Sequence, residues 1–154
     1  MSEHEVKFEI EGLITLLAQH LYADPDVFLR EMIQNAHDSI VKRKALASER
    51  GDTSVPAGKI EIVPIAPRSL RIVDNGAGLS EKEIHDFLST IGRSGTRELK
   101  ELLRTSDHAT AVELIGQFGI GLLSAFVVAE RVEITTKPEG GPALRWASAG
   151  GKQY

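Results

Sequence analysis

The chain has 154 residues, of which 42% are hydrophobic and 26% are charged; its formal net charge is −4 and it has no cysteine. A chain of this size and composition is expected to form one globular domain with a substantial core. The acidic balance without a basic cluster argues against nucleic acid as the main partner, and the lack of cysteine excludes disulfides and thiolate metal sites. Because no apolar run is long enough for a transmembrane helix and the first residues lack the features of a secretion signal, we expect a cytoplasmic location and no membrane partner.

The first predicted elements are a short strand over residues 6–10 and a helix over residues 13–21, where apolar residues recur with helical spacing. Asp24 and Pro25 then predict the cap and the first position of a second helix. We expect that helix to run from about residue 26 to residue 44 or beyond.

A hairpin and a short helix are predicted in the middle of the chain. Residues 59–63 and 69–73 alternate in polarity, and residues 64–68 would join them as antiparallel strands. The sequence Ser-Glu-Lys-Glu at residues 80–83 is a capping box, which predicts a helix to about Leu88.

The C-terminal part predicts helices over residues 96–103 and 121–129, separated by a polar break at residues 106–110. Residues 131–136 and 143–148 predict two further strands. This order of elements indicates an α+β fold, a two-layer sandwich in which helices cover one face of a mainly antiparallel sheet.

The long helix carries the first polar motif. At about 100° per residue, Glu31, Asn35, Asp38 and Lys42 fall within one stripe of the helix. The amide oxygen of Asn35 could bind Mg²⁺, and Glu31 could orient or deprotonate a water molecule that attacks a terminal phosphate. The alternative is the solvated face of an ordinary amphipathic helix.

The second motif, Asp-Asn-Gly-Ala-Gly at residues 74–78, follows an apolar strand. We expect Asp74 to be partly buried there and to need a partner, for which the exocyclic amine of adenine is suitable. Gly76 and Gly78 would let the backbone approach a flat ring and adopt positive φ. The alternative is a plain turn between two elements.

The third motif places Gly116, Gly119 and Gly121 directly before a helix. Backbone N–H groups at the start of a helix bind anions, so these glycines could hold phosphate. Close packing of the helix against a sheet explains such glycines equally well.

A fourth segment, Gly-Arg-Ser-Gly-Thr at residues 92–96, lies between two short predicted helices. Glycines on either side of a basic and a hydroxyl residue suit a mobile lid over phosphates. The alternative is an ordinary polar loop.

Four stretches together resemble the N-terminal ATPase domain of the heat-shock protein 90 chaperones, most closely the bacterial HtpG type. They are residues 28–38 (FLREMIQNAHD), 74–78 (DNGAG), 90–96 (TIGRSGT) and 115–121 (IGQFGIG). The resemblance extends over about residues 6–151. It implies the Bergerat-type fold of the gyrase B, MutL and histidine kinase superfamily, with a mobile helical lid over ATP.

The resemblance also implies a role for each matching residue. Glu31 would be the catalytic base, Asn35 would bind Mg²⁺ and phosphate, and Asp74 would accept the adenine amine with help from Gly78. The remaining ATP- or ADP-binding positions implied are Asp38, Lys42, Leu79, Arg93, Ser94, Gly116, Gln117, Phe118, Gly119, Ile120, Gly121 and Leu122.

Three positions depart from the family pattern. Phe87 stands where the family has a polar residue near the ribose, Arg93 replaces a lysine, and Leu122 replaces an aromatic residue. In the family, moreover, the domain continues through further strands and is followed by middle and C-terminal domains. We therefore expect residues 1–154 to be an N-terminal ATP-binding domain that is truncated before its last strands.

The predicted function is the ATP-binding domain of a molecular chaperone, with client proteins, homodimer formation and the other domains belonging to the longer protein. Hydrolysis is expected to be slow or absent in the isolated chain, because an arginine from another domain is missing. Two alternatives stay open: a nucleotide-gated DNA-acting ATPase of the gyrase or MutL type, and a non-catalytic nucleotide-binding interaction module.

Overall fold

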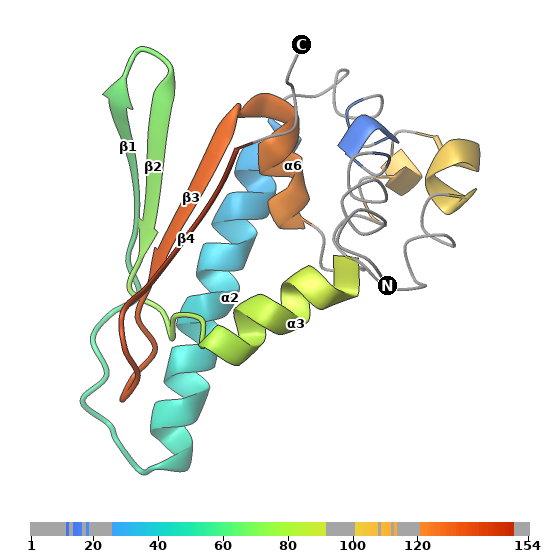
Figure 1. Cartoon of the computed structure of the whole chain (residues 1–154). Helices are drawn as coiled ribbons and strands as arrows, with labels where there is room; N and C mark the ends of the chain where they lie inside the picture. The colour runs from blue at the N-terminus through green and yellow to red at the C-terminus, as the bar shows by residue number, and fades with distance from the viewer. Residues whose placement is uncertain are drawn as a thin grey trace.

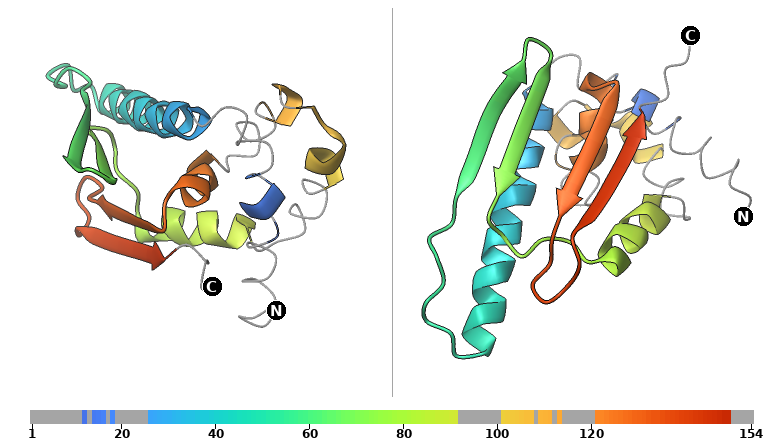
Figure 2. Two further views of the ribbon diagram at one scale, coloured as in Figure 1. Left: turned by 90° about the horizontal axis from the view of Figure 1, so that it is seen from above. Right: turned by 60° about the vertical axis from the view of Figure 1, so that its left-hand side comes forward.

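The computed structural model describes residues 26–91, 101–107, 109–111, 113 and 121–149, together with residues 12, 14–16 and 18; for residues 87–91 and 148–149 it describes the backbone only. The elements follow in the order α2 (Val27–Glu49), β1 (Ile60–Ala66), β2 (Ser69–Asp74), α3 (Glu81–Ile91), α6 (Gly121–Val128), β3 (Arg131–Thr136) and β4 (Leu144–Ala149). Both hairpins lie on the same side of the helices (Figures 1 and 2). The predicted α+β arrangement is confirmed.

The long helix α2 contacts α6 and both strands of the first hairpin. Ala36, Ile40 and Ala47 share one buried face of this helix, and α6 packs against it. In α6 the side chains of Leu123 and Ala125 are buried, which completes this part of the core. Burial of these apolar faces stabilises both helices more than helix propensity alone would.

The start of α2 differs from the prediction. The N-cap is Asp26 rather than Asp24, and the carbonyl of Asp26 accepts the hydrogen bond from Arg30 N. A proline fixes only its own φ and does not determine whether the next residue is already helical. The position of Pro25 therefore defines the start of the helix only to within one or two residues. Asp24 and Pro25 themselves lie outside the described residues, as does the strand predicted over residues 6–10.

The first hairpin is tighter than predicted. β1 and β2 pair antiparallel from Ile60↔Asp74 to Ala66↔Ser69, which leaves a two-residue turn instead of the expected loop over residues 64–68. The strand continues through Pro64 because the register shifts between Pro64 and Ala66, and such an irregularity accommodates a residue without an N–H group.

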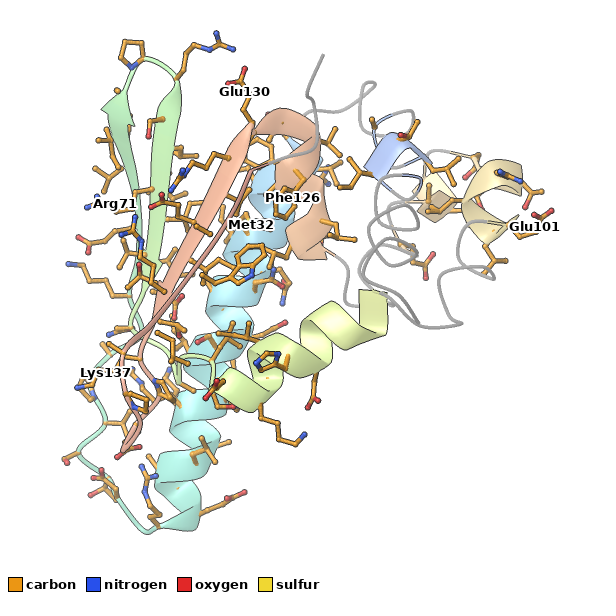
Figure 3. The ribbon with its side chains drawn as sticks, viewed as in Figure 1. Met32, Arg71, Glu101, Phe126, Glu130 and Lys137 are labelled. Carbon is orange, nitrogen blue, oxygen red and sulfur yellow. The ribbon has the colours of Figure 1, made fainter. Side chains whose placement is uncertain are left out.

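The second hairpin agrees closely with the sequence prediction. β3 covers residues 131–136 as expected, and β4 begins and ends one residue later than expected. Phe126 of α6, labelled in Figure 3, meets Trp146 of β4 edge to face, with ring centroids 6.1 Å apart. This contact attaches the hairpin to the helical layer.

Three short predicted helices are confirmed where the structure describes them. Ser80 N donates to Glu83 Oε2 at 2.8 Å and Glu83 N donates to Ser80 Oγ at 3.3 Å, so the capping box forms at the start of α3. Residues 14–16 and 101–103 are helical, as predicted for residues 13–21 and 96–103. The second helix continues to residue 105, and residues 109 and 110, predicted as part of a polar break, are helical. None of the described helices is long and apolar enough to cross a membrane.

Candidate functional site

The start of α6 lies directly against Glu31 of α2. A methyl group placed on Gly121 would lie 2.3 Å from Glu31 Oε2 and 3.2 Å from Glu31 Cβ. Only a glycine fits here without displacing the carboxylate. The structure therefore brings the first motif and the last glycine of the third motif into contact, although they are far apart in the sequence.

The environment of Glu31 also alters its chemistry. Burial raises the pKa of the Glu31 carboxyl above its ordinary value of 4.5, and the neighbouring Arg30 opposes that shift. A carboxylate with a raised pKa is a better proton acceptor than an ordinary one, as a general base requires.

The second motif docks on the same helix two turns further along. Ala77 N donates a 2.9 Å hydrogen bond to the carbonyl oxygen of Ser39. A methyl group on Gly76 would lie 2.1 Å from Ser39 Oγ and 2.5 Å from the backbone carbon of Ser39. The close approach that Gly76 permits is thus to α2, so packing within the protein already requires this glycine.

Asp74 is exposed, which contradicts the expected partial burial. The reason is that β2 belongs to a two-stranded ribbon and, among the described residues, hydrogen-bonds only to β1. Asp74 Oδ1 accepts a 2.8 Å hydrogen bond from Gly76 N, while Oδ2 has no hydrogen-bond partner among the described residues. One carboxylate oxygen is therefore fixed by the turn and the other is available to a ligand.

The end of the second motif meets β3. Gly78 has φ +70°, as predicted, whereas the positive φ predicted for Gly76 is wrong. A methyl group on Gly78 would lie 2.6 Å from the carbonyl oxygen of Lys137. Lys137 directly follows β3 and is labelled in Figure 3. Leu79 N donates to Thr136 Oγ1 at 2.7 Å. Gly78 and Leu79 thus join the motif to the second hairpin.

Asn35 lies on α2 one turn after Glu31 and one turn before Ser39. Its side chain is exposed and makes no hydrogen bond to the described residues. Its amide oxygen is therefore free to bind a ligand between the start of α6 and the turn at Asp74.

The other two residues of the predicted stripe have partners within the protein. Asp38 accepts a 2.8 Å hydrogen bond from Gln34 Nε2, one turn earlier. Lys42 Nζ forms an ion pair with Glu83 of α3. This ion pair and the capping hydrogen bond from Ser80 hold the pKa of Glu83 down at about 2, with the Lys42 bond as the main cause. Lys42 therefore also serves to attach α3 to α2.

Part of the predicted site lies outside the described residues: Arg93, Ser94, Gly116, Gln117, Phe118, Gly119 and Ile120. Most of the expected lid falls in the same region. Leu122, the first residue after Gly121, is half-buried in α6.

Comparison with known proteins agrees with this geometry. The sequence profile described as histidine kinase-, DNA gyrase B-, and HSP90-like ATPase matches residues 24–147. The chain belongs to this ATPase family. The matched region contains all three motifs, so the family resemblance predicted from the sequence is confirmed.

Several relatives of this chain carry the name chaperone protein HtpG. Those of Salinispora tropica and Halorhodospira halophila are 40% identical over 100% and 97% of this chain, and that of Mycobacterium tuberculosis is 39% identical over 97%. The chain spans about a quarter of the length of these relatives, 25%, 24% and 24% respectively. They favour the chaperone interpretation over the DNA-acting alternative.

Several residues that organise the candidate site were not predicted from the sequence. Ser39 receives the Asp74–Gly78 turn, and its position one turn after Asn35 was a usable signal. Glu83 was recognised as a capping residue, but its ion pair with Lys42 depends on how α3 packs. Thr136 offered no local signal, because its role arises from the meeting of two hairpins.

Proposed function

We propose that the chain binds ATP along α2, with the adenine amine at Asp74 and the phosphates toward the start of α6. The observation that carries this proposal is the docking of two motifs two turns apart on one helix. Gly121 lies against Glu31, the turn at Gly76 lies against Ser39, and Asn35 stands between them. A nucleotide has a base at one end and anionic phosphates at the other. Its two ends therefore match Asp74 at one end of the proposed site and the start of α6 at the other.

The phosphate end of the proposed site rests on the start of α6. Unpaired backbone N–H groups at a helix start, with the helix dipole, favour anionic groups. The glycine loop at residues 116–120 precedes this helix in the sequence and is proposed to contribute further N–H groups. Arg93 and Ser94 are proposed to act there as part of the lid.

Glu31 is proposed as the base for hydrolysis of the terminal phosphate. Its raised pKa suits it to accept a proton from an attacking water molecule. Contact with Gly121 keeps its carboxylate at the start of α6, where the phosphates would lie.

Asn35 is proposed as the protein ligand of Mg²⁺. Its free amide oxygen is the kind of hard donor that Mg²⁺ accepts alongside phosphate and water oxygens. When bound, the ion would neutralise charge on the phosphates. Asp38, Lys42, Gly78, Leu79 and Leu122 complete the proposed contacts.

At the level of the whole protein, we propose that this chain is the N-terminal part of an ATP-dependent chaperone. Its relatives of about 40% identity are named chaperone protein HtpG. Client binding, homodimer formation and faster hydrolysis would then depend on middle and C-terminal domains.

The proposal is tested by a thermal unfolding titration of this chain with ATP, with and without Mg²⁺. A ligand that binds only the folded state raises the melting temperature with concentration. We expect a rise with ATP that is larger when Mg²⁺ is present, and no rise with duplex DNA at the same ionic strength. No response to millimolar ATP would contradict the proposed function.

A further inference from the structure

Asn75, between Asp74 and Gly76, makes the densest set of hydrogen bonds in the second motif. Its side-chain Oδ1 accepts a 2.8 Å bond from Lys59 N, and its Nδ2 donates a 2.9 Å bond to the carbonyl of Ala57. Its backbone N–H donates to the carbonyl of Lys59 at 3.2 Å. One residue thus links the turn to Ala57 and Lys59, directly before β1.

These bonds extend the hairpin beyond its last strand pair. The ladder between β1 and β2 ends at Ile60↔Asp74, and Asn75 continues it with side-chain atoms. The segment before β1 is also attached to α2, because Arg43 Nη2 donates a 2.7 Å hydrogen bond to the Pro56 carbonyl and Gly58 lies against Ile40. Asp74 is therefore held between a strand pair on one side and the Asn75 contacts on the other.

The opposite side of the turn is fixed to α2. Gly76 lies against Ser39, and Ala77 N donates to the Ser39 carbonyl. Gly76 N in turn holds Asp74 Oδ1. The orientation of the Asp74 carboxylate is thus determined by a turn whose two ends are attached to different elements.

We propose that Asn75 is a positioning residue that sets the Asp74 carboxylate and thereby the preference for a purine with an exocyclic amine. Asn75 does not need to touch the nucleotide. It fixes the backbone on which Asp74 Oδ1 is bound to Gly76 N and Oδ2 is left to accept a hydrogen bond. This inference rests on the proposed function, because it assumes that Asp74 is the acceptor for adenine.

A comparison of two nucleotides distinguishes this positioning role from a general contribution of Asn75 to the stability of the fold. ATP carries an amine at purine position 6, whereas inosine triphosphate carries an oxygen there and the same sugar and triphosphate. A displaced Asp74 carboxylate should weaken ATP binding and leave inosine triphosphate binding nearly unchanged. General loosening of the domain would weaken both ligands alike.

The test compares the affinities of this chain for ATP and inosine triphosphate by calorimetry, in the wild type, Asn75→Ala and Asn75→Ser. We expect the wild type to prefer ATP and Asn75→Ala to reduce the preference about tenfold, the size of one lost hydrogen bond to a charged acceptor. Asn75→Ser retains a hydroxyl that could accept from Lys59 N, so its preference should be intermediate. It also keeps the test decisive if Asn75→Ala does not fold.

A matched control is Asp52→Ala, which removes another side chain that braces the same loop. Asp52 Oδ1 accepts bonds from Ser54 N and Ser54 Oγ at 2.9 and 2.8 Å and does not touch the turn. The Asp52→Ala variant should prefer ATP over inosine triphosphate to the same extent as the wild type. An unchanged preference in Asn75→Ala, or equal weakening of both ligands, would overturn the inference. If the wild type itself shows no preference for ATP, the proposed role of Asp74 fails first, which is a separate result.

Discussion

Gly121 and Glu31 form the contact on which the proposed hydrolysis depends, since a methyl group at Gly121 would lie 2.3 Å from the Glu31 carboxylate. We predict that Gly121→Ala moves this carboxylate and lowers ATP turnover in the longer protein by about 10- to 100-fold, which is less than the roughly 100- to 10,000-fold attributed to a general base because the carboxylate is displaced and not removed. Stability should change by no more than about 1 kcal/mol, because alanine is the better helix former and offsets part of the crowding.

Steady-state ATPase assays and urea unfolding measure these two effects separately. The double variant Gly121→Ala/Glu31→Ala provides the control. It should be no slower than Glu31→Ala alone, because the methyl group acts only through the carboxylate. A further loss in the double variant would show that Gly121 has another role.

The raised pKa of Glu31 predicts an acid limb in the rate of ATP hydrolysis. A base must be deprotonated, so turnover in the longer protein should rise with pH through an apparent pKa above 4.5. Glu31→Ala should retain ATP binding, lose turnover and show no such limb. The measurement is kcat as a function of pH at saturating ATP. An identical limb in Glu31→Ala would assign it to another group.

Local features of this fold were predictable from the sequence, and contacts between distant segments were not. The capping box of Ser80 and Glu83 and the alternation over residues 131–136 depend on neighbouring residues, so these predictions were correct. The contact of Gly76 with Ser39 depends on how a hairpin packs on α2. The sequence showed that glycine was required there but not that a helix, rather than a ligand, was the reason.

The same limit applies to the candidate site. Helical spacing placed Glu31 and Asn35 on one stripe, and the structure adds the partners of each. Burial of Asp74 was wrongly predicted because an apolar strand was assumed to lie inside a wider sheet. Strand β2 instead hydrogen-bonds, among the described residues, to β1 alone.

The ion pair between Lys42 and Glu83 predicts a pH-dependent contribution to stability. The pKa of Glu83 falls from its ordinary value of 4.5 to about 2 in the folded protein. The stabilisation is therefore complete above pH 4.5 and is lost as the pH falls toward 2. The side chain is 38% exposed, so solvent screening limits the contribution to about 1 kcal/mol or less.

We expect Glu83→Gln to lower the free energy of unfolding by this amount at pH 7 and to approach the wild type as the pH is lowered. Urea denaturation at several pH values measures the difference. Glu81→Gln is the control, because Glu81 lies in the same helical turn and only approaches His85 at 3.9 Å. An equal, pH-independent loss in both variants would exclude a specific role for the Lys42 contact.

The packing of Gly76 on α2 predicts a strongly destabilising substitution. Gly76→Ala would place a methyl group 2.5 Å from backbone and 2.6 Å from Cβ of Ser39, which cannot move away as a flexible side-chain end could. We expect a loss of about 1–3 kcal/mol or more. Gly51→Ala is the control for glycine replacement, since Gly51 has φ +71° but a methyl group added there would have no atom within 4 Å. A smaller loss at Gly76 than at Gly51 would contradict the close packing.

Asp74→Asn tests the proposed adenine contact with almost no change in shape. The amide oxygen can still accept the hydrogen bond from Gly76 N, so the turn and the melting temperature should be retained. The second position then carries an NH₂ group instead of Oδ2. This NH₂ group would face the exocyclic amine of the purine, and both groups are hydrogen-bond donors. A site that loses its acceptor in this way rejects its ligand by several orders of magnitude, so ATP binding should become undetectable by calorimetry. An unchanged ATP affinity in a folded Asp74→Asn chain would remove Asp74 from the proposed site and leave the phosphate end, with Glu31 and Asn35, to be tested by itself.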